Sequence, residues 1–186
     1  TLDIKPVKNS LWSIDFVFDQ GKIYLSVLDA ATKRLFILKT PTKELKHVVK
    51  RLSDLFNNFG KPNEIVADLE FLKQPLLNFL YDSEVKIRDI TRHSPFLNPV
   101  ERQHGHLKQI AIRNGVDLEK ACVIYNVTPF LDIPKGLNQQ WCPLKLYSLN
   151  CEKSIQLLRE IRDNESKNRR FRRQNIQGSN QERFNR

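Results

Sequence analysis

The sequence contains no methionine, only three cysteines and no long apolar run, and each absence excludes a class of protein. No segment approaches the roughly 18–20 apolar residues that a membrane-spanning helix needs, and the first residues lack the basic-then-apolar pattern of a signal peptide. We therefore expect no membrane association. Because the chain has no methionine and begins at Thr1, we expect it to be a fragment or a processed product of a longer protein.

The cysteines Cys122, Cys142 and Cys151 are odd in number and show no Cys-x-x-Cys spacing. This pattern argues against a secreted disulfide scaffold and against a zinc site within the chain. A free cysteine usually behaves as a small buried hydrophobic residue. We expect reduced, buried cysteines and no zinc.

Basic residues outnumber acidic ones, with 31 Lys and Arg against 21 Asp and Glu, so the formal net charge is +10. Such an excess favours a polyanionic partner, above all nucleic acid, although charge alone is weak evidence. The hydrophobic fraction of 40% and the charged fraction of 28% are typical of a folded globular chain. At 186 residues, the chain has room for one domain and an appendage.

Hydrophobic periodicity predicts a mixed α/β architecture. In the first strand-like segment, Trp12, Ile14, Phe16 and Phe18 form one apolar face, so Asp15 must lie on the opposite face. Further strands are predicted at residues 23–28, 35–38, 65–67 and 85–90. Helices are predicted at residues 45–59, 71–81, 98–114, 117–125 and 150–161. Residues 126–149 are expected to be irregular. Three antiparallel strands followed by alternating helices and strands indicate a mixed five-stranded sheet flanked by helices.

Three acidic residues stand out on separate elements: Asp15 in the middle of a strand, Asp68 at the end of another, and Glu101 in the first turn of a helix. Rigidly held carboxylates on separate elements are what a two-metal phosphoryl-transfer site requires. Each also has an ordinary explanation. Asn98-x-x-Glu101 matches a helix capping box, and an Asp at a strand end commonly forms a turn. Asp15 is harder to explain in this way, since Asp is depleted within strands.

Three motifs that contain these acids resemble the Asp, Asp, Glu signature of integrase catalytic cores from gypsy-type LTR retrotransposons and retroviruses. They are Trp12-Ser13-Ile14-Asp15, Ile65-Val66-Ala67-Asp68 and the run from Ser94 to His104. Shorter similarities occur at Leu28-Asp29, at Tyr125–Pro129 and at Pro143–Leu146, so the resemblance covers roughly residues 11–150. The sequence departs from the family in three places. Only 32 residues separate Asp68 from Glu101, where 35 are usual, Leu69-Glu70-Phe71 replaces an Asn-Gly turn, and Pro99 stands where the family has Gly.

The resemblance implies a ribonuclease-H-like fold in which the first and fourth strands are parallel neighbours. It also implies two Mg²⁺ or Mn²⁺ ions bound by Asp15, Asp68 and Glu101, which would be the catalytic residues. The implied reactions are 3′-end processing and strand transfer on DNA, carried out by a homo-oligomer and located in the nucleus during integration. Glu70 and Asp29 are rival carboxylates, for which we expect structural or accessory roles.

The helix that follows Glu101 carries basic residues, and so does the C-terminal tail. The resemblance implies that Lys108, two turns past Glu101, contacts DNA, whereas His104 is expected only to pack or cap locally. Arg102 and Arg113 belong to a second polar stripe, for which a solvated helix face is an equally good explanation. We expect residues 1–150 to form the catalytic core, and residues 151–186 a helix and a flexible basic tail that neutralises phosphates or serves as a nuclear-import signal. The residues expected to bind nucleic acid are Lys108, Arg102, Arg113, Arg169, Arg170, Arg172 and Arg173.

Two functions from different classes follow. The first is an active integrase core. The second is a non-catalytic DNA-binding or scaffold protein derived from an integrase. The intact set of three acids favours the first, whereas the altered loops favour the second. A ribonuclease H is a weaker third possibility, because that enzyme normally uses four acids.

Overall fold

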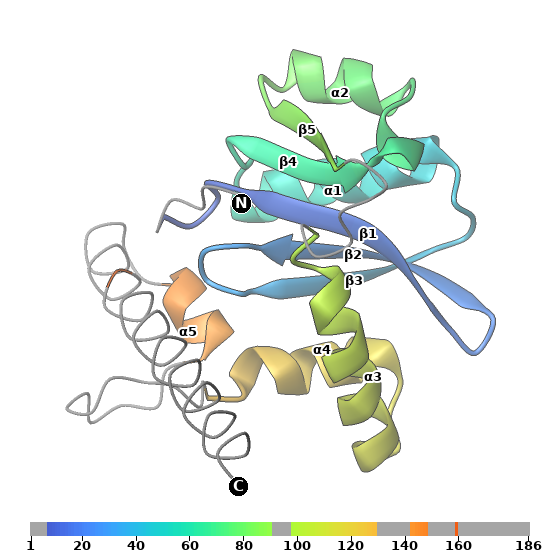
Figure 1. Ribbon diagram of the computed structural model, residues 1–186, viewed down its shortest axis with the longest axis vertical. Helices are drawn as coiled ribbons and strands as arrows, with labels where there is room; N and C mark the ends of the chain where they lie inside the picture. Colours follow the sequence, from blue (N-terminus) through green and yellow to red (C-terminus); the bar gives the residue numbers. More distant parts are fainter. Residues whose placement is uncertain (1–6, 91–97, 130–141, 149–158, 160–186) are drawn as a thin grey trace, which may run out of the picture.

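The computed structural model describes residues 7–90, 98–129 and 142–148, together with residue 159 (Figure 1). Five strands form one sheet in the order β3-β2-β1-β4-β5. β1 pairs with β2 and β2 with β3 in antiparallel fashion, whereas β4 pairs in parallel with both β1 and β5. This is the mixed five-stranded sheet that the sequence predicts. The strands are β1 (Trp12–Asp19), β2 (Lys22–Asp29), β3 (Leu35–Thr40), β4 (Glu64–Asp68) and β5 (Lys86–Ile90).

Helices cover both faces of the sheet (Figure 1). One face packs against α1 and α2, and the other against α3 and α4. The helices are α1 (Leu45–Phe59), the short 3-10 helix η1 (Leu69–Phe71), α2 (Leu76–Asp82), α3 (Glu101–Asn114), α4 (Leu118–Val127) and α5 (Pro143–Ser148). Among the described residues, no helix is long and apolar enough to cross a membrane.

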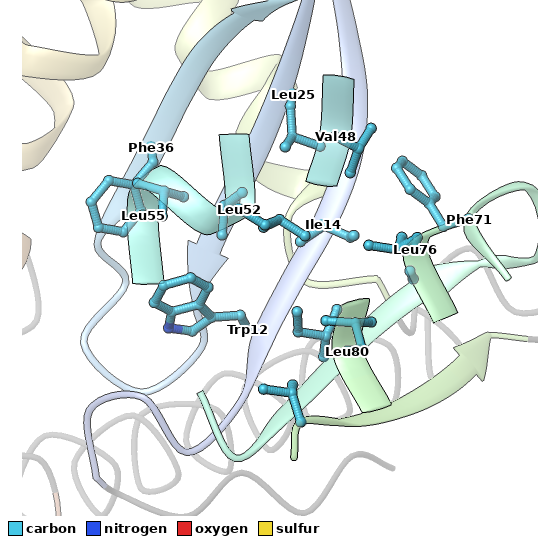
Figure 2. Packing of buried hydrophobic residues seen from close by; sticks show 14 of the residues in the cluster. Trp12, Ile14, Leu25, Phe36, Val48, Leu52, Leu55, Phe71, Leu76 and Leu80 are labelled. Carbon is cyan, nitrogen blue, oxygen red and sulfur yellow. The ribbon is translucent and has the colours of Figure 1, made fainter. Parts of the chain in front are cut away.

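Side chains alternate along β1, so its even and odd positions contribute to two hydrophobic cores on opposite faces of the sheet. The even positions Trp12, Ile14 and Phe16 pack with Val48 and Leu52 of α1 on one face (Figure 2). Val17 faces the other way and packs with residues of α3 and α4, including Leu107. Successive side chains in a strand point to opposite faces, so Asp15 lies on the α3 side of the sheet. The sequence pattern had predicted this orientation.

The structure corrects three boundaries. α3 begins at Glu101, with Val100 at its N-cap, rather than at residue 98. The helix predicted over 71–81 is divided into η1 and a later α2, with Pro75 at the N-cap of α2. α5 lies inside the segment predicted to be irregular. The helix predicted over 150–161 lies outside the described residues, apart from Arg159, which is helical.

The described cysteines agree with the expectation of reduced, buried thiols. Cys122 and Cys142 are both free and buried. Burial raises the pKa of the Cys122 thiol to about 12, so this side chain stays protonated and unreactive at neutral pH. Cys151 lies outside the described residues.

Candidate active site on the α3 face of the sheet

Asp15 is a mostly buried carboxylate on the central strand. Its side chain is 15% exposed, and one oxygen accepts a hydrogen bond of 2.7 Å from the backbone N–H of Phe16. Its cross-strand partner on β2 is Ser26, whose hydroxyl donates to the Asp15 carbonyl at 2.9 Å. The even positions of β1 supply its apolar face against α1. Asp15 is at an odd position, so its side chain lies on the face that meets α3.

Asp68 and Glu101 come to the same side of the sheet from two other elements. β1 and β4 are parallel neighbours, with Trp12 opposite Ile65 and Ser13 opposite Val66. The same offset of 53 residues relates Asp15 to Asp68 (65 − 12 = 68 − 15). Glu101 opens α3, whose buried residues pack on this face. The topology therefore brings the three acids to the same face of the sheet.

The pKa of Asp15 reflects the nearby acids. Its pKa is raised from 3.8 to about 7, first by burial and then by the negative charges of Asp68, Glu101 and Glu70. The Phe16 N–H acts in the opposite direction. Burial and the charge of Asp68 also raise the pKa of Glu101. A carboxylate with a raised pKa among like charges is typical of sites that bind a cation or exchange a proton.

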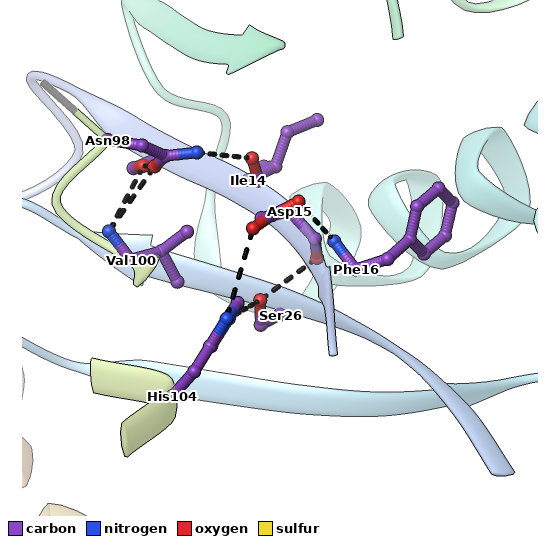
Figure 3. A network of polar contacts seen from close by, with 8 residues as sticks. Ile14, Asp15, Phe16, Ser26, Asn98, Val100 and His104 are labelled. Atoms are coloured by element: carbon purple, nitrogen blue, oxygen red, sulfur yellow. Dashed lines mark hydrogen bonds and ion pairs between the residues drawn. The ribbon is translucent and has the colours of Figure 1, made fainter. Parts of the chain in front are cut away.

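His104 contacts Asp15 and Ser26, rather than packing only locally as expected from the sequence (Figure 3). Its Nε2 lies 2.6 Å from the Ser26 hydroxyl, and its Nδ1 lies 3.9 Å from Asp15 Oδ2. Burial, assisted by the charge of Lys108, lowers the pKa of His104 to about 4. The ring is therefore neutral at neutral pH, and its contact with Asp15 is not an ion pair. The helical spacing from Glu101 to His104, three residues, was the available sequence signal.

Asn98 does not form the expected capping box with Glu101. The residue at the N-cap position is Val100, and the Asn98 Oδ1 accepts from the backbone N–H of Val100 at 3.3 Å rather than from that of Glu101. Asn98 is fully buried and contacts β1 instead, where its Oδ1 accepts a hydrogen bond from the Ser13 hydroxyl (Figure 3). Its Nδ2 lies 3.5 Å from the Ile14 carbonyl oxygen, to which it donates. The polar residue before the helix therefore joins α3 to the strand that carries Asp15.

The two rival carboxylates have other roles in this structure. Asp29 is fully buried and accepts hydrogen bonds of 2.7 Å from the backbone of Asn9 and from both the backbone and the hydroxyl of Thr32. It therefore organises the turn after β2. Glu70 is exposed on η1, and its carboxylate lies 3.5 Å from the Lys43 ammonium.

The three acids supply suitable donors for a divalent cation, because Mg²⁺ and Mn²⁺ favour carboxylate oxygens and Asp15 sits among like charges. As the side chains lie, however, no group of three or more His, Cys, Asp or Glu residues in the described parts of the chain could hold a metal ion. Binding by all three carboxylates would thus require at least one of them to change rotamer. Their assignment as catalytic metal ligands remains a prediction.

The basic residues of α3 are exposed. Lys108 lies one turn beyond His104, and its charge acts on that ring. Arg102 and Arg113 are exposed on the same helix. Arg169, Arg170, Arg172 and Arg173 lie outside the described residues, as does nearly all of the segment predicted as a C-terminal tail.

No protein-family model and no curated protein sequence matches this chain. Among solved structures, a chain of the simian T-cell lymphotropic virus intasome in complex with PP2A regulatory subunit B56 gamma matches with a TM-score of 0.63 at 15% identity, over 77% of this chain. The catalytic core domain of BIV integrase matches with a TM-score of 0.60 at 17% identity, over 75% of this chain and 93% of its own length. The chain spans 55% of the intasome chain. At these identities the likeness is one of fold.

Proposed function

We propose that this chain, which has the ribonuclease-H-like fold of retroviral integrase catalytic cores, cleaves and joins DNA strands as the core of a retroelement integrase. The observation that carries the proposal is the buried Asp15 on the central strand, whose pKa is raised by burial and by the charges of Asp68 and Glu101. Holding such a carboxylate in its charged form costs free energy when no cation is bound, and a bound cation offsets that cost. The reactions would be 3′-end processing and strand transfer.

The chain's own residues would have distinct roles. Asp15, Asp68 and Glu101 would hold two Mg²⁺ or Mn²⁺ ions, which when bound supply a nucleophilic oxygen and neutralise charge at the scissile phosphate. Asp15 is fixed by the Phe16 N–H, and the neutral His104 packs beside it without adding positive charge. Glu101 is the acid best able to adjust, because its side chain is longer and only partly buried. The exposed Lys108 would contact the DNA backbone.

Two further features belong to this proposal. The simian T-cell lymphotropic virus match is part of an intasome, which supports assembly of this chain as a homo-oligomer on the DNA ends. Integration into chromosomal DNA would place the protein in the nucleus. The non-catalytic DNA-binding or scaffold alternative gains no support from the gathered acids.

Replacement of Glu101 by Gln should abolish cleavage while leaving the fold intact. The change removes one charged ligand but keeps side-chain size, and we expect a loss of activity on the order of 100-fold or more, since even groups that only orient metal ligands cost about 10–100-fold. The measurement is cleavage of end-labelled DNA duplexes in Mn²⁺ and in Mg²⁺.

Glu119→Gln is the matched control, because Glu119 is an exposed acid in the first turn of α4. This variant should cleave like the wild type. Cleavage that survives Glu101→Gln would show that another acid, Glu70 first, is the ligand. A wild type that is neither stabilised by metal nor active would favour the scaffold alternative.

Lys108→Ala should weaken DNA binding and flatten its dependence on salt. Each phosphate contact contributes about 0.9 to the slope of log affinity against log salt on duplex DNA, so the slope should fall by about that amount. Fluorescence anisotropy of labelled duplexes at several salt concentrations measures it. Lys50→Ala removes a lysine that is also exposed, from α1 on the opposite face of the sheet, and should leave the slope unchanged. Equal effects of the two variants would mean that binding is diffuse and not centred on α3.

A further inference from the structure

Asn98 is a fully buried polar residue in the short segment that precedes α3 (Figure 3). Its Oδ1 accepts from the Ser13 hydroxyl and, at 3.3 Å, from the backbone N–H of Val100. Its Nδ2 donates to the Ile14 carbonyl oxygen, and the Val100 N–H also reaches the Ser13 hydroxyl at 3.4 Å. Ser13 and Val100 are likewise fully buried. This group of contacts joins the entry to α3 to the two residues of β1 that immediately precede Asp15.

A second contact to the central strands occurs six residues further along the chain. His104 meets Ser26 of β2 and Asp15 of β1. Glu101 lies midway between the two contacts, three residues after Asn98 and three before His104. The backbone of Glu101 is therefore held against the sheet from both sides, on the face that carries Asp15.

We propose that Asn98 is a positioning residue for the active site, which holds the first turn of α3 against Ser13 and Ile14 so that Glu101 can complete metal binding with Asp15. The inference rests on the proposed function. Asn98 itself would touch neither metal nor DNA. Its effect passes through the backbone of α3, since a shift of the helix start by a fraction of a turn carries the Glu101 carboxylate away from Asp15.

The chain contains a matched control for an Asn that only stabilises the fold. Asn126 of α4 is also buried and also joins a helix to a strand, through hydrogen bonds to the N–H and carbonyl of Leu35 at 3.0 and 2.7 Å. Its bonding partner Leu35 is on β3, which is separated from β1 by β2 and from β4 by both β2 and β1. Removing either amide breaks similar bonds, but only those of Asn98 join the residues that precede Asp15 to the start of α3, where Glu101 lies.

The experiment compares the full chain as wild type, Asn98→Ala, Ser13→Ala, the double variant and Asn126→Ala. Three quantities are measured for each: the melting temperature in EDTA, the affinity for Mn²⁺ by calorimetry, and kcat and KM for cleavage of a DNA duplex. We expect Asn98→Ala and Asn126→Ala to lose thermal stability to a similar degree. Only Asn98→Ala should also bind Mn²⁺ about 10–100-fold more weakly and lose kcat while KM is kept. The effects of Asn98→Ala and Ser13→Ala on Mn²⁺ affinity should be non-additive, because both act through one contact.

The outcomes separate this inference from the function on which it rests. If Asn98→Ala binds Mn²⁺ as tightly as the wild type does, Asn98 is structural only and the inference is overturned, while the proposed function stands. If Asn126→Ala weakens Mn²⁺ binding equally, general loss of stability explains both, and the inference is again overturned. If the wild type binds no Mn²⁺, both fail together. Should Asn98→Ala not fold, Asn98→Ser and Ser13→Ala provide the same comparison with a smaller change in the buried site.

Discussion

Asp15→Asn should make the metal-free protein more stable at pH 8 by on the order of 4 kcal/mol, and by far less at pH 4. The pKa of Asp15 is about 7 in the folded state against an ordinary 3.8, a difference of about 3 units, each worth about 1.4 kcal/mol. Below about pH 4 the carboxyl is protonated in both states. As the pH rises to 7 the unfolded chain releases this proton and the folded chain keeps it, so the free energy of unfolding falls.

The amide should keep the contact that the carboxylate makes, since its oxygen can still accept from the Phe16 N–H. Urea unfolding in EDTA between pH 4 and pH 8 measures the effect. Asp54→Asn, an exposed change on α1, should show no such trend. Mg²⁺ or Mn²⁺ should stabilise the wild type at pH 8 and the Asp15→Asn variant less, through linkage. A stability gain that is the same at pH 4 and pH 8 would show that the charge of Asp15 is not its source.

Trp12→Ala should destabilise the protein by about 3–5 kcal/mol, the usual cost of removing a large buried aromatic side chain. Trp12 is fully buried at the start of β1, where its ring lies 6.0 Å from that of Phe36 and 5.8 Å from that of Phe56. Its Nε1 also donates to the Asn9 side chain at 3.2 Å. The free energy of unfolding of a domain of this size is roughly 5–15 kcal/mol, so this one substitution removes a large share of it.

The midpoint of urea unfolding measures the loss. Phe18→Ala is the matched control, because Phe18 is an aromatic residue of the same strand that is 46% exposed. It should cost about 1 kcal/mol or less. An equal cost at the two positions would contradict the assignment of Trp12 to the core. If Trp12→Ala does not accumulate as folded protein, Trp12→Phe gives a smaller loss that can be measured.

The sequence allows most of the architecture to be predicted, because the relevant information is local. Alternating apolar residues along β1 determine which face carries Asp15, and the apolar spacing of α1 determines where this helix begins and ends. The order of the strands in the sheet depends on residues that are far apart in the sequence. That β1 lies between β2 and β4 was expected only from the resemblance to integrase cores, because nothing in either segment specifies the partner.

The roles of Asn98 and His104 could not be predicted in the same way. Asn98 has the spacing of a helix cap, and only its burial against Ser13, 85 residues away in sequence, shows the different use of its amide. His104 was expected to pack locally, but its partners Asp15 and Ser26 are also far away in sequence. α5 was missed because a six-residue helix gives too short a periodic signal, and its buried Tyr147 gains stability from Phe36 and Phe59 rather than from its neighbours.

The two outer strands of the sheet are also protected from pairing with other molecules, by different means. A strand with unpaired backbone groups is a template for aggregation. On β3, the Asn126 side chain forms hydrogen bonds with the N–H and the carbonyl of Leu35, much as a further strand would. The Arg51 guanidinium donates two hydrogen bonds, of 3.1 and 2.8 Å, to the carbonyl oxygen of Lys39. On β5, the exposed charged residues Lys86, Arg88 and Asp89 line the other edge, and charged side chains disfavour pairing with a further strand. Both edges of the sheet therefore resist the addition of a strand from a second copy of the chain.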